Sequence, residues 1–129
     1  MKILVVDDEH DVRQLFEQSF RREIRSGQLH FIFAYSGEEA LDFLQAHHSE
    51  VVLILSDINM PGMSGLELLR HIRQDFPAPP PPTVLMITAY GDQATRDEAM
   101  LIGANDLISK PVNFAALKQK LALLNPDPA

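Results

Sequence analysis

Residues Val51 to Gly65 read VVLILSDINMPGMSG, and the rest of the chain can be interpreted from this segment. Its first five residues are apolar and rich in β-branched side chains, without polar alternation, which indicates a strand buried on both faces of a sheet. Ser56 and Asp57 end the apolar run, and proline and glycine then mark a loop. A helical pattern follows from about Ser64 to Gln74. Asp57 is therefore expected at the carboxyl end of a central strand, the edge where open α/β sheets bind ligands.

The composition indicates one acidic globular domain. The chain has 129 residues, 46% of them hydrophobic, which is enough for a core and too many for a disordered chain. Its net charge of −7 disfavours direct binding of nucleic acid. The basic cluster Arg21, Arg22 and Arg25 is interpreted as the solvated end of a helix. The chain contains no cysteine for a disulfide or a thiolate metal site, and its apolar runs are too short for a membrane span.

Five short apolar runs alternate with helical patterns along the chain. The expected strands are residues 2–6, 29–34, 51–55, 84–88 and 106–109. The expected helices start near residues 10, 36, 64, 91 and 113, and the first one fades between Arg25 and Gly27. Strand and helix alternating with short connectors predict a parallel sheet with helices on both faces. Five such units favour an α/β, doubly wound, flavodoxin-like fold with strand order 2-1-3-4-5.

Spacing and caps predict the details of the helices. The expected apolar faces are Val12, Leu15, Phe16 and Phe20 in the first helix, Ala94, Ala99 and Met100 in the fourth, and Leu117, Leu121 and Leu124 in the last. Ser36 with Glu39 predicts a capping box, and Asn113 predicts a cap for the last helix. The segment 77–82 holds five of the nine prolines and is expected to be a stiff connector, on the side of the sheet opposite Asp57.

Polar residues stand where the expected strands end. They are Asp7 and Asp8 after the first strand, Asp57 after the third, Thr88 at the end of the fourth and Lys110 after the fifth. Because parallel strands end on one edge of the sheet, these side chains are expected to converge. Three carboxylates close together repel one another unless a cation joins them. A ligand set made only of oxygen favours Mg²⁺ or Mn²⁺.

The same residues suit phosphoryl transfer. Asp57 is a candidate nucleophile toward phosphorus, which would give an aspartyl phosphate. Thr88 offers a hydroxyl group and Lys110 a positive charge to phosphoryl oxygens. Together with a metal ion, the lysine would stabilise charge on the transferring group. Each residue alone also fits an ordinary cap, strand end or surface turn, and only their joint placement favours a site.

Four motifs carry a resemblance to a known family. They are ILVVDDE at Ile3–Glu9, SDINMPGMSG at Ser56–Gly65, MITAY at Met86–Tyr90 and GANDLISKP at Gly103–Pro111. Over nearly its whole length the chain resembles the receiver domain of two-component response regulators. The resemblance implies residues 1–125 as the receiver and residues 126–129 as a tail or the start of a linker. It also implies a cytoplasmic signalling module.

The resemblance implies a role for each residue of the site. Asp57 would be the phosphoacceptor, and Thr88 and Lys110 would act on the phosphoryl group as switch hydroxyl and pairing lysine. The Mg²⁺ ligands would be Asp8 directly, Asp7 mainly through water, Asp57, and the main-chain carbonyl of Asn59. The Lys110–Pro111 peptide is expected to be cis.

The resemblance implies protein partners rather than nucleic acid or a membrane. The phosphoryl donor would be a phosphohistidine on a sensor histidine kinase or a histidine phosphotransfer protein. The signal would pass to a downstream effector protein or an output domain, and we find no output domain in this sequence.

One position departs from the family pattern. Receiver domains usually place Tyr or Phe three residues before the lysine, and Leu107 stands there in this chain. In such domains the ring swings inward when the threonine moves and carries the signal to the outer face. Phosphorylation itself does not need the ring, so the departure puts only this aromatic signal in question. Tyr90 is then interpreted either as a gate to the phosphoryl group or as an ordinary loop residue.

Three alternatives fit the residues less well. Phosphatases with an aspartate nucleophile have a second Asp two residues later, where this chain has Asn59, so we expect no enzyme with a turnover substrate. An FMN binder would need a phosphate loop after the first strand, where Asp7 and Asp8 repel phosphate. The alternative is a receiver-like module that acts by protein contact without phosphorylation. It is retained because Leu107 lacks the ring of the usual aromatic switch.

Overall fold

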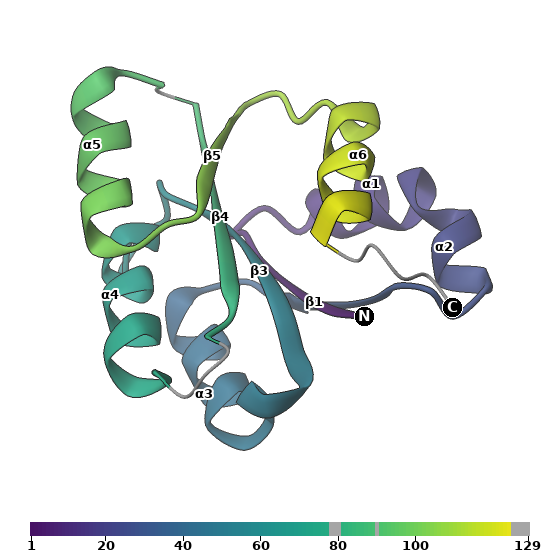
Figure 1. The fold of residues 1–129 in the computed structure, drawn as a ribbon, viewed down its shortest axis with the longest axis horizontal. Helices are drawn as coiled ribbons and strands as arrows, with labels where there is room; N and C mark the ends of the chain where they lie inside the picture. Colours follow the sequence, from purple (N-terminus) through teal and green to yellow (C-terminus); the bar gives the residue numbers. More distant parts are fainter. Residues whose placement is uncertain (78–80, 90, 125–129) are drawn as a thin grey trace.

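The predicted doubly wound sheet is confirmed in the computed structural model, which describes residues 1–77, 81–89 and 91–124. The strands are β1 (Lys2–Val6), β2 (His30–Ala34), β3 (Val51–Asp57), β4 (Thr83–Thr88) and β5 (Asp106–Ser109). They form one parallel sheet in the order β2-β1-β3-β4-β5 (Figure 1). The pattern of apolar runs had therefore predicted every described strand to within two residues at each end.

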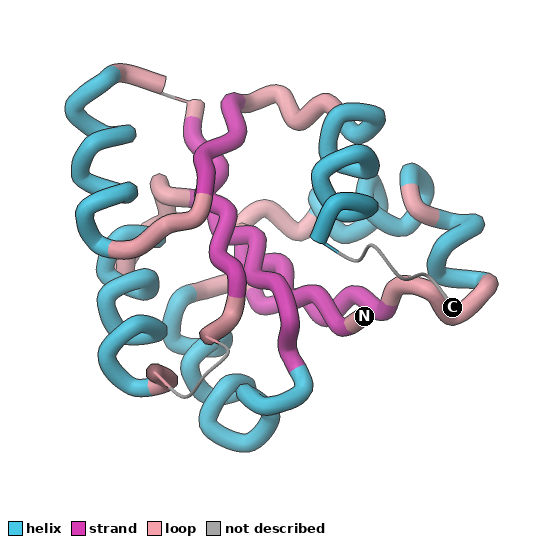
Figure 2. The backbone as a smooth tube through the Cα atoms, viewed as in Figure 1, coloured by secondary structure: helices cyan, strands magenta, loops and turns pink. Residues whose placement is uncertain are grey.

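Helices cover both faces of the sheet, as Figure 2 shows. They are α1 (Asp11–Ser19), α2 (Arg21–Arg25), α3 (Gly37–His47), α4 (Gly65–Asp75), α5 (Gln93–Ile102) and α6 (Phe114–Leu124), with a 3-10 turn η1 (His48–Glu50) after α3. One core lies between the sheet and α3, α4 and α5, and the other between the sheet and α1 and α6, whereas α2 has no buried residue. Within the described part of the chain, no helix has the length and apolar character needed to cross a bilayer.

Successive side chains of the central strands point to opposite faces of the sheet and so belong alternately to the two cores. In β3, Ile54 contributes to one core, whereas Leu53 and Leu55 contribute to the other. Val52 was predicted to be buried, but it is 50% exposed. The pairing with β1 skips this residue, because Lys2 pairs with Val51 and Ile3 with Leu53, so Val52 lies in a bulge near the strand's amino end.

An aromatic cluster fills the core under α1 and α6. Rings of Phe16, Phe20, Phe31, Phe33 and Phe114 lie with centroids 5.1 to 6.2 Å apart. Edge and tilted contacts in this range are favourable for aromatic rings. Phe20 is fully buried and stands between two short helices, where one continuous helix was predicted.

Three predicted inward-facing side chains point to solvent instead. Leu15 is 51% exposed and Met100 is 45% exposed, and Ala94 is exposed as well. The buried row on this side runs through Phe16 of α1 and Phe20 directly after the helix, and Leu15 lies about 100° around the helix from Phe16. In α5 the buried residue is Ala99, and its neighbours in the sequence turn away.

The predicted capping side chains of Ser36 and Asn113 are confirmed, but Glu39 makes its half of the predicted capping box with Tyr35 rather than with Ser36. Ser36 accepts the N–H of Glu39 at 3.1 Å, and Asn113 accepts that of Ala116 at 3.1 Å. The carboxylate of Glu39 reaches back to the N–H of Tyr35, one residue before the capping serine. These contacts satisfy backbone donors that the first turn of a helix leaves free.

The amino ends of β4 and β5 are tied to α4 by one arginine. Arg73 donates to the carbonyl oxygens of Gly103 and Pro82 and to the side chain of Asn105, at 2.7 to 2.9 Å. Pro82 directly precedes β4, so this end of the proline connector lies at the edge opposite Asp57, as predicted. Pro79 and Pro80 lie outside the described residues.

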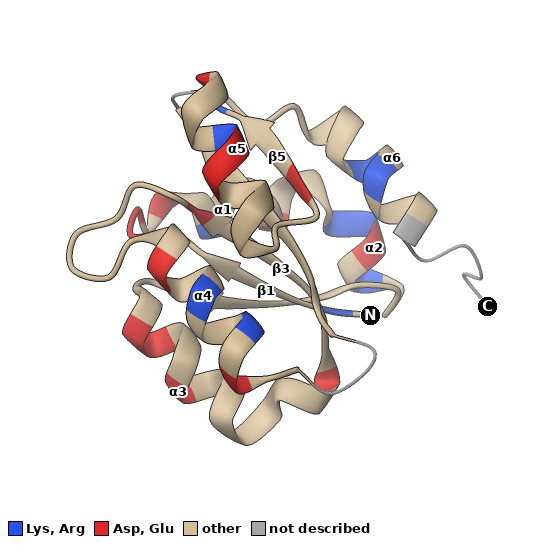
Figure 3. Cartoon of the chain, turned by 60° about the vertical axis from the view of Figure 1, so that its left-hand side comes forward, with Lys and Arg blue, Asp and Glu red and all other residues tan. Residues whose placement is uncertain are grey.

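Charges of both signs are distributed over the surface. Figure 3 shows acidic residues on α3, α4 and α5, with basic residues among them on α4 and α5. Several neighbours pair, such as Arg70 with Glu98 across α4 and α5 at 3.4 Å.

Candidate functional site

The carboxyl ends of four strands bring the predicted residues together. Asp7 follows β1, and its N–H donates to Ala34 at the end of β2 at 3.1 Å. Asp57 is the last residue of β3, and Lys110 follows β5, where its N–H donates to the carbonyl oxygen of Thr88 at 2.9 Å. The backbone pairing of the sheet therefore fixes where each of these side chains starts.

Three carboxylates form the centre of the site. Asp7, Asp8 and Asp57 each place one carboxylate oxygen within 4.8 Å of the others. Asp7 and Asp57 are buried and Asp8 is half-buried. Burial strengthens the repulsion between carboxylates, and a hard cation held by oxygen ligands relieves it. The residues present therefore fit a divalent ion such as Mg²⁺.

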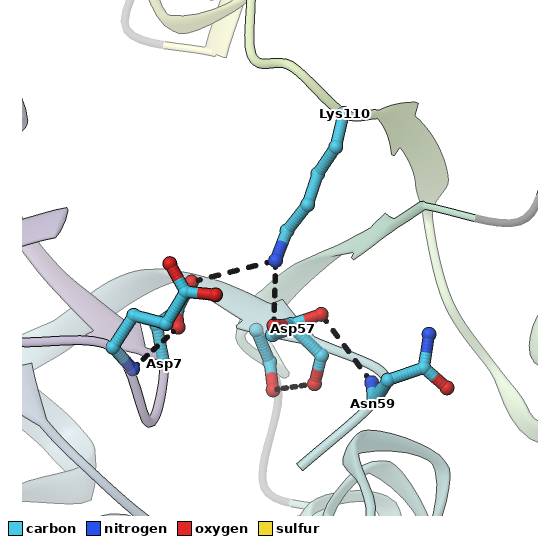
Figure 4. A network of polar contacts seen from close by, with 6 residues as sticks. Asp7, Asp57, Asn59 and Lys110 are labelled. Carbon is cyan, nitrogen blue, oxygen red and sulfur yellow. Dashed lines mark hydrogen bonds and ion pairs between the residues drawn. The ribbon is translucent and has the colours of Figure 1, made fainter.

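Lys110 supplies positive charge within the structure itself. Its Nζ lies 2.8 Å from Oδ2 of Asp57 and 3.9 Å from Oδ2 of Asp7 (Figure 4). Burial by itself would lower the pKa of Lys110, but the hydrogen bond to Asp57 and the nearby carboxylates outweigh it, so the pKa is raised. The lysine is therefore held in its charged form at the centre of the acidic group.

The pKa of Asp7 is determined mainly by the burial of its carboxyl group. Removal from water raises the pKa of Asp7, and the charge of Asp57 adds to this effect. The N–H of Glu9, which donates to Asp7 Oδ1 at 2.9 Å, acts in the opposite direction without cancelling it. A cation bound here would favour the ionised carboxylate.

The loop after β3 folds tightly against Asp57. The N–H of Asn59 donates to Asp57 Oδ1 at 3.3 Å, so the backbone of Asn59 is at the site. A Cβ atom added to Gly65 would lie 2.1 Å from the carbonyl oxygen of Asp57. The N–H of Gly65 donates to Ile58 at 2.8 Å. The sequence indicated a turn glycine at this position, but it did not show that Gly65 contacts the backbone of Asp57.

A hollow of about 570 Å³ opens beside the acidic group. It is lined by Ile58, Asn59, Met60, Pro61, Ser64, Leu66, Thr88 and Thr95. Thr88 is buried at the end of β4, as expected from the sequence. Thr95 on α5 was not predicted, because a threonine in the first turns of a helix carries no distinguishing signal.

Comparison with known proteins agrees with this geometry. The sequence profile described as "Response regulator receiver domain" matches residues 3–122. The chain belongs to the response regulator receiver domains. The response regulator protein PilR of Pseudomonas aeruginosa is 37% identical over 130 residues, covering 98% of this chain and 27% of the relative. This receiver domain therefore spans about a quarter of the length of PilR.

Two solved structures share the fold closely. The CheX-CheY-BeF3-Mg²⁺ complex from Borrelia burgdorferi matches with a TM-score of 0.83 and 27% identity, over 96% of this chain and 88% of that one. The complex of the Saccharomyces cerevisiae histidine phosphotransfer protein Ypd1 with the receiver domain of Ssk1 matches with a TM-score of 0.82 and 25% identity. That match covers 95% of this chain and 86% of the other.

Leu107 replaces the usual aromatic residue of a receiver domain. It lies opposite Met86 in the pairing of β4 with β5, and it is 7% exposed. Its side chain belongs to the core that includes Ala99 of α5. Leu107 therefore packs against the sheet and this helix. The predicted cis peptide between Lys110 and Pro111 is also confirmed. Tyr90, the other candidate for switching, lies outside the described residues.

Proposed function

We propose that this receiver domain accepts a phosphoryl group on Asp57 from a phosphohistidine of a sensor kinase or a phosphotransfer protein. The observation that carries the proposal is the buried carboxylate of Asp57, held 2.8 Å from Lys110 beside two further carboxylates. The family supports it, and so do two relatives whose structures contain BeF3 with Mg²⁺ and a histidine phosphotransfer protein. The new charge would then alter contacts with a downstream effector protein or an output domain.

The proposed step exchanges one bond to phosphorus for another. A carboxylate oxygen of Asp57 forms a bond to phosphorus while the bond from phosphorus to the histidine nitrogen breaks. The electron pair of the broken bond stays on the imidazole, which takes a proton from solvent. Lys110 donates a hydrogen bond to a phosphoryl oxygen, and the Thr88 hydroxyl donates another.

A divalent ion fits this step. The carboxylates of Asp7, Asp8 and Asp57 and the carbonyl oxygen of Asn59 would hold Mg²⁺, or Mn²⁺ in its place. When bound, the ion supplies positive charge that stabilises the transferring phosphoryl group. Asp8 would be a direct ligand, and Asp7 would act mainly through water.

The domain would switch contacts rather than turn over a free substrate. Asn59 stands where phosphatases with an aspartate nucleophile carry a second Asp, so this position offers no general acid. We place the module in the cytoplasm, assign residues 1–125 to the receiver, and assign residues 126–129 to a tail or linker. A receiver that acts without phosphorylation is the alternative, and it rests on Leu107.

Intact-mass measurement tests the proposal. Incubation with acetyl phosphate and Mg²⁺ should add one phosphoryl mass to the protein. Asp57→Asn should abolish the addition, whereas Asp75→Asn on the exposed surface of α4 should not. Labelling of Asp57→Asn equal to that of the wild type would refute the assignment, and an unlabelled wild type would favour the alternative.

Thermal unfolding tests the ion. Mg²⁺ should raise the melting temperature of the wild type, because a ligand that binds only the folded state stabilises it. Asp8→Ala should reduce that gain, and it should raise stability without metal by relieving repulsion. Equal responses of the two proteins to Mg²⁺ would contradict the metal site.

A further inference from the structure

We propose that the stacked rings of His10 and Tyr35 are positioning residues that hold the loop carrying Asp8 in its Mg²⁺-binding arrangement. This inference rests on the proposed function. His10 directly precedes α1, and Tyr35 directly follows β2. The two residues therefore flank the acidic group on the side of the sheet away from Lys110.

The two rings make a close, parallel contact. Their centroids lie 3.9 Å apart and their planes differ by 4°. His10 is exposed and Tyr35 is half-buried, so the contact is not a by-product of core packing. His10 stands at the N-cap of α1 but makes no side-chain hydrogen bond to that helix. Within residues 1–77, 81–89 and 91–124, the stacking on Tyr35 is the contact that orients the His10 ring.

Tyr35 provides a fixed support for the loop. Its N–H donates to Oε2 of Glu39 at 3.1 Å, which ties it to the first turn of α3. The preceding residue, Ala34, accepts the N–H of Asp7 at 3.1 Å. The loop from Asp7 to His10 is therefore held at both ends by residues at the carboxyl end of β2. Ala34 accepts a backbone hydrogen bond from Asp7, and Tyr35 stacks on His10.

Asp8 lies between these two anchors. It is the one half-buried member of the three carboxylates. Among the residues that the structure describes, its side chain makes no hydrogen bond or ion pair. In contrast, the Asp7 carboxylate accepts a hydrogen bond from the N–H of Glu9, and the Asp57 carboxylate accepts one from Nζ of Lys110. The position of the Asp8 carboxylate thus depends on the backbone of the loop, and so on the stacked rings.

Mg²⁺ titration of ring variants by calorimetry, or by melting temperature, tests the proposal on the whole chain. Tyr35→Ala should weaken Mg²⁺ binding by about tenfold, as loss of a group that orients a metal ligand does. Tyr35→Phe keeps the ring and should bind Mg²⁺ as the wild type does. The matched control is His47→Ala, which removes a ring stacked on Phe43 with centroids 4.6 Å apart, on α3.

The readout separates positioning from general stability. A purely structural role would lower the melting temperature without metal and leave the dissociation constant for Mg²⁺ unchanged, which would overturn the proposal. A loss in Tyr35→Phe equal to that in Tyr35→Ala would also overturn it, because the hydroxyl group would then be responsible. If Tyr35→Ala does not fold, His10→Ala makes the same test at an exposed position.

The same titration distinguishes this inference from the function on which it rests. A wild type that binds Mg²⁺ and becomes phosphorylated, with ring variants that bind the ion equally well, would refute the stacking role alone. A wild type that does not bind Mg²⁺ would refute the metal site and this inference together.

Discussion

The ammonium group of Lys110 lies 2.8 Å from Oδ2 of Asp57, although 53 positions separate the two residues in the sequence. Asp57 ends β3 and Lys110 follows β5, so their contact reaches across the end of β4, which lies between them in the sheet. The Asp57 side chain is 3% exposed and that of Lys110 is 30% exposed. A buried carboxylate thus depends on a cation from a strand that is not its neighbour.

Replacing Lys110 by Met should destabilise the protein by about 1–3 kcal/mol without metal, because Asp57 would lose the partner of a buried charge. The remaining cluster would be more negative, so Mg²⁺ should stabilise the variant more than it stabilises the wild type. Urea unfolding with and without Mg²⁺ measures both effects. Lys120→Met, at a more exposed ion pair with Asp106, is the control and should lose less. An unchanged Mg²⁺ increment in Lys110→Met would contradict this prediction.

Gly65→Ala should destabilise the protein by at least about 1–3 kcal/mol and slow phosphorylation, because the new Cβ would meet the Asp57 backbone. Gly37→Ala is the matched control, since both glycines open a helix behind a capping serine. The atoms nearest to a Cβ at residue 37 belong to the side chain of Met63, with Sδ at 2.7 Å, and they are not backbone atoms as at Gly65. Unfolding and labelling rates that are alike in the two variants would show that the close approach at Asp57 has no effect.

Stability should depend on pH through Asp106. The hydrogen bond from Lys120, at 2.6 Å, lowers the pKa of Asp106 in the folded protein. Its contribution is therefore present above the unfolded value of about 4 and is lost as the pH falls through the lower folded value. Asp106→Asn should be less stable than the wild type at neutral pH by up to about 1 kcal/mol, since the pair is partly exposed. Urea midpoints of the two proteins should converge in acid, and a gap that does not narrow would disprove the assignment.

Leu107 should keep its buried position when the domain is phosphorylated. Exposing a leucine side chain costs about 1.5–3 kcal/mol, and Leu107 has no polar group that the phosphoryl group would attract. A beryllofluoride mimic should therefore shift amide signals at Thr88 and along α5 strongly and the methyl signals of Leu107 weakly. NMR spectra of the two states measure this. A large rotamer change at Leu107 would show that leucine simply takes the place of the aromatic switch.

The sequence predicted those features that follow from local patterns. Short apolar runs located the strands, and Ser36 and Asn113 marked two helix starts. Strand ends on one edge then predicted that Asp7, Asp57 and Lys110 would meet.

Features that depend on neighbouring elements were not predictable in the same way. The apolar spacing included Leu15 and Met100, but it could not show which side of each helix the sheet would cover. The close approach of Gly65 to Asp57 depends on how the loop between them folds back, and the stacking of His10 on Tyr35 joins segments far apart in the chain, so no apolar or capping pattern marks either one.

Because β5 is the last strand along the chain, the residues of the site are synthesised in a fixed order. Asp7, Asp8 and Asp57 leave the ribosome well before Lys110, because β5 is the last strand to be synthesised. Until that strand pairs with β4, Lys110 does not lie beside the carboxylates, and the divalent cation proposed above would be their counter-charge. If the proposed metal site is present, the nascent chain would bind its metal before Lys110 reaches the site, and the pairing of the last strand then adds the lysine to the acidic group.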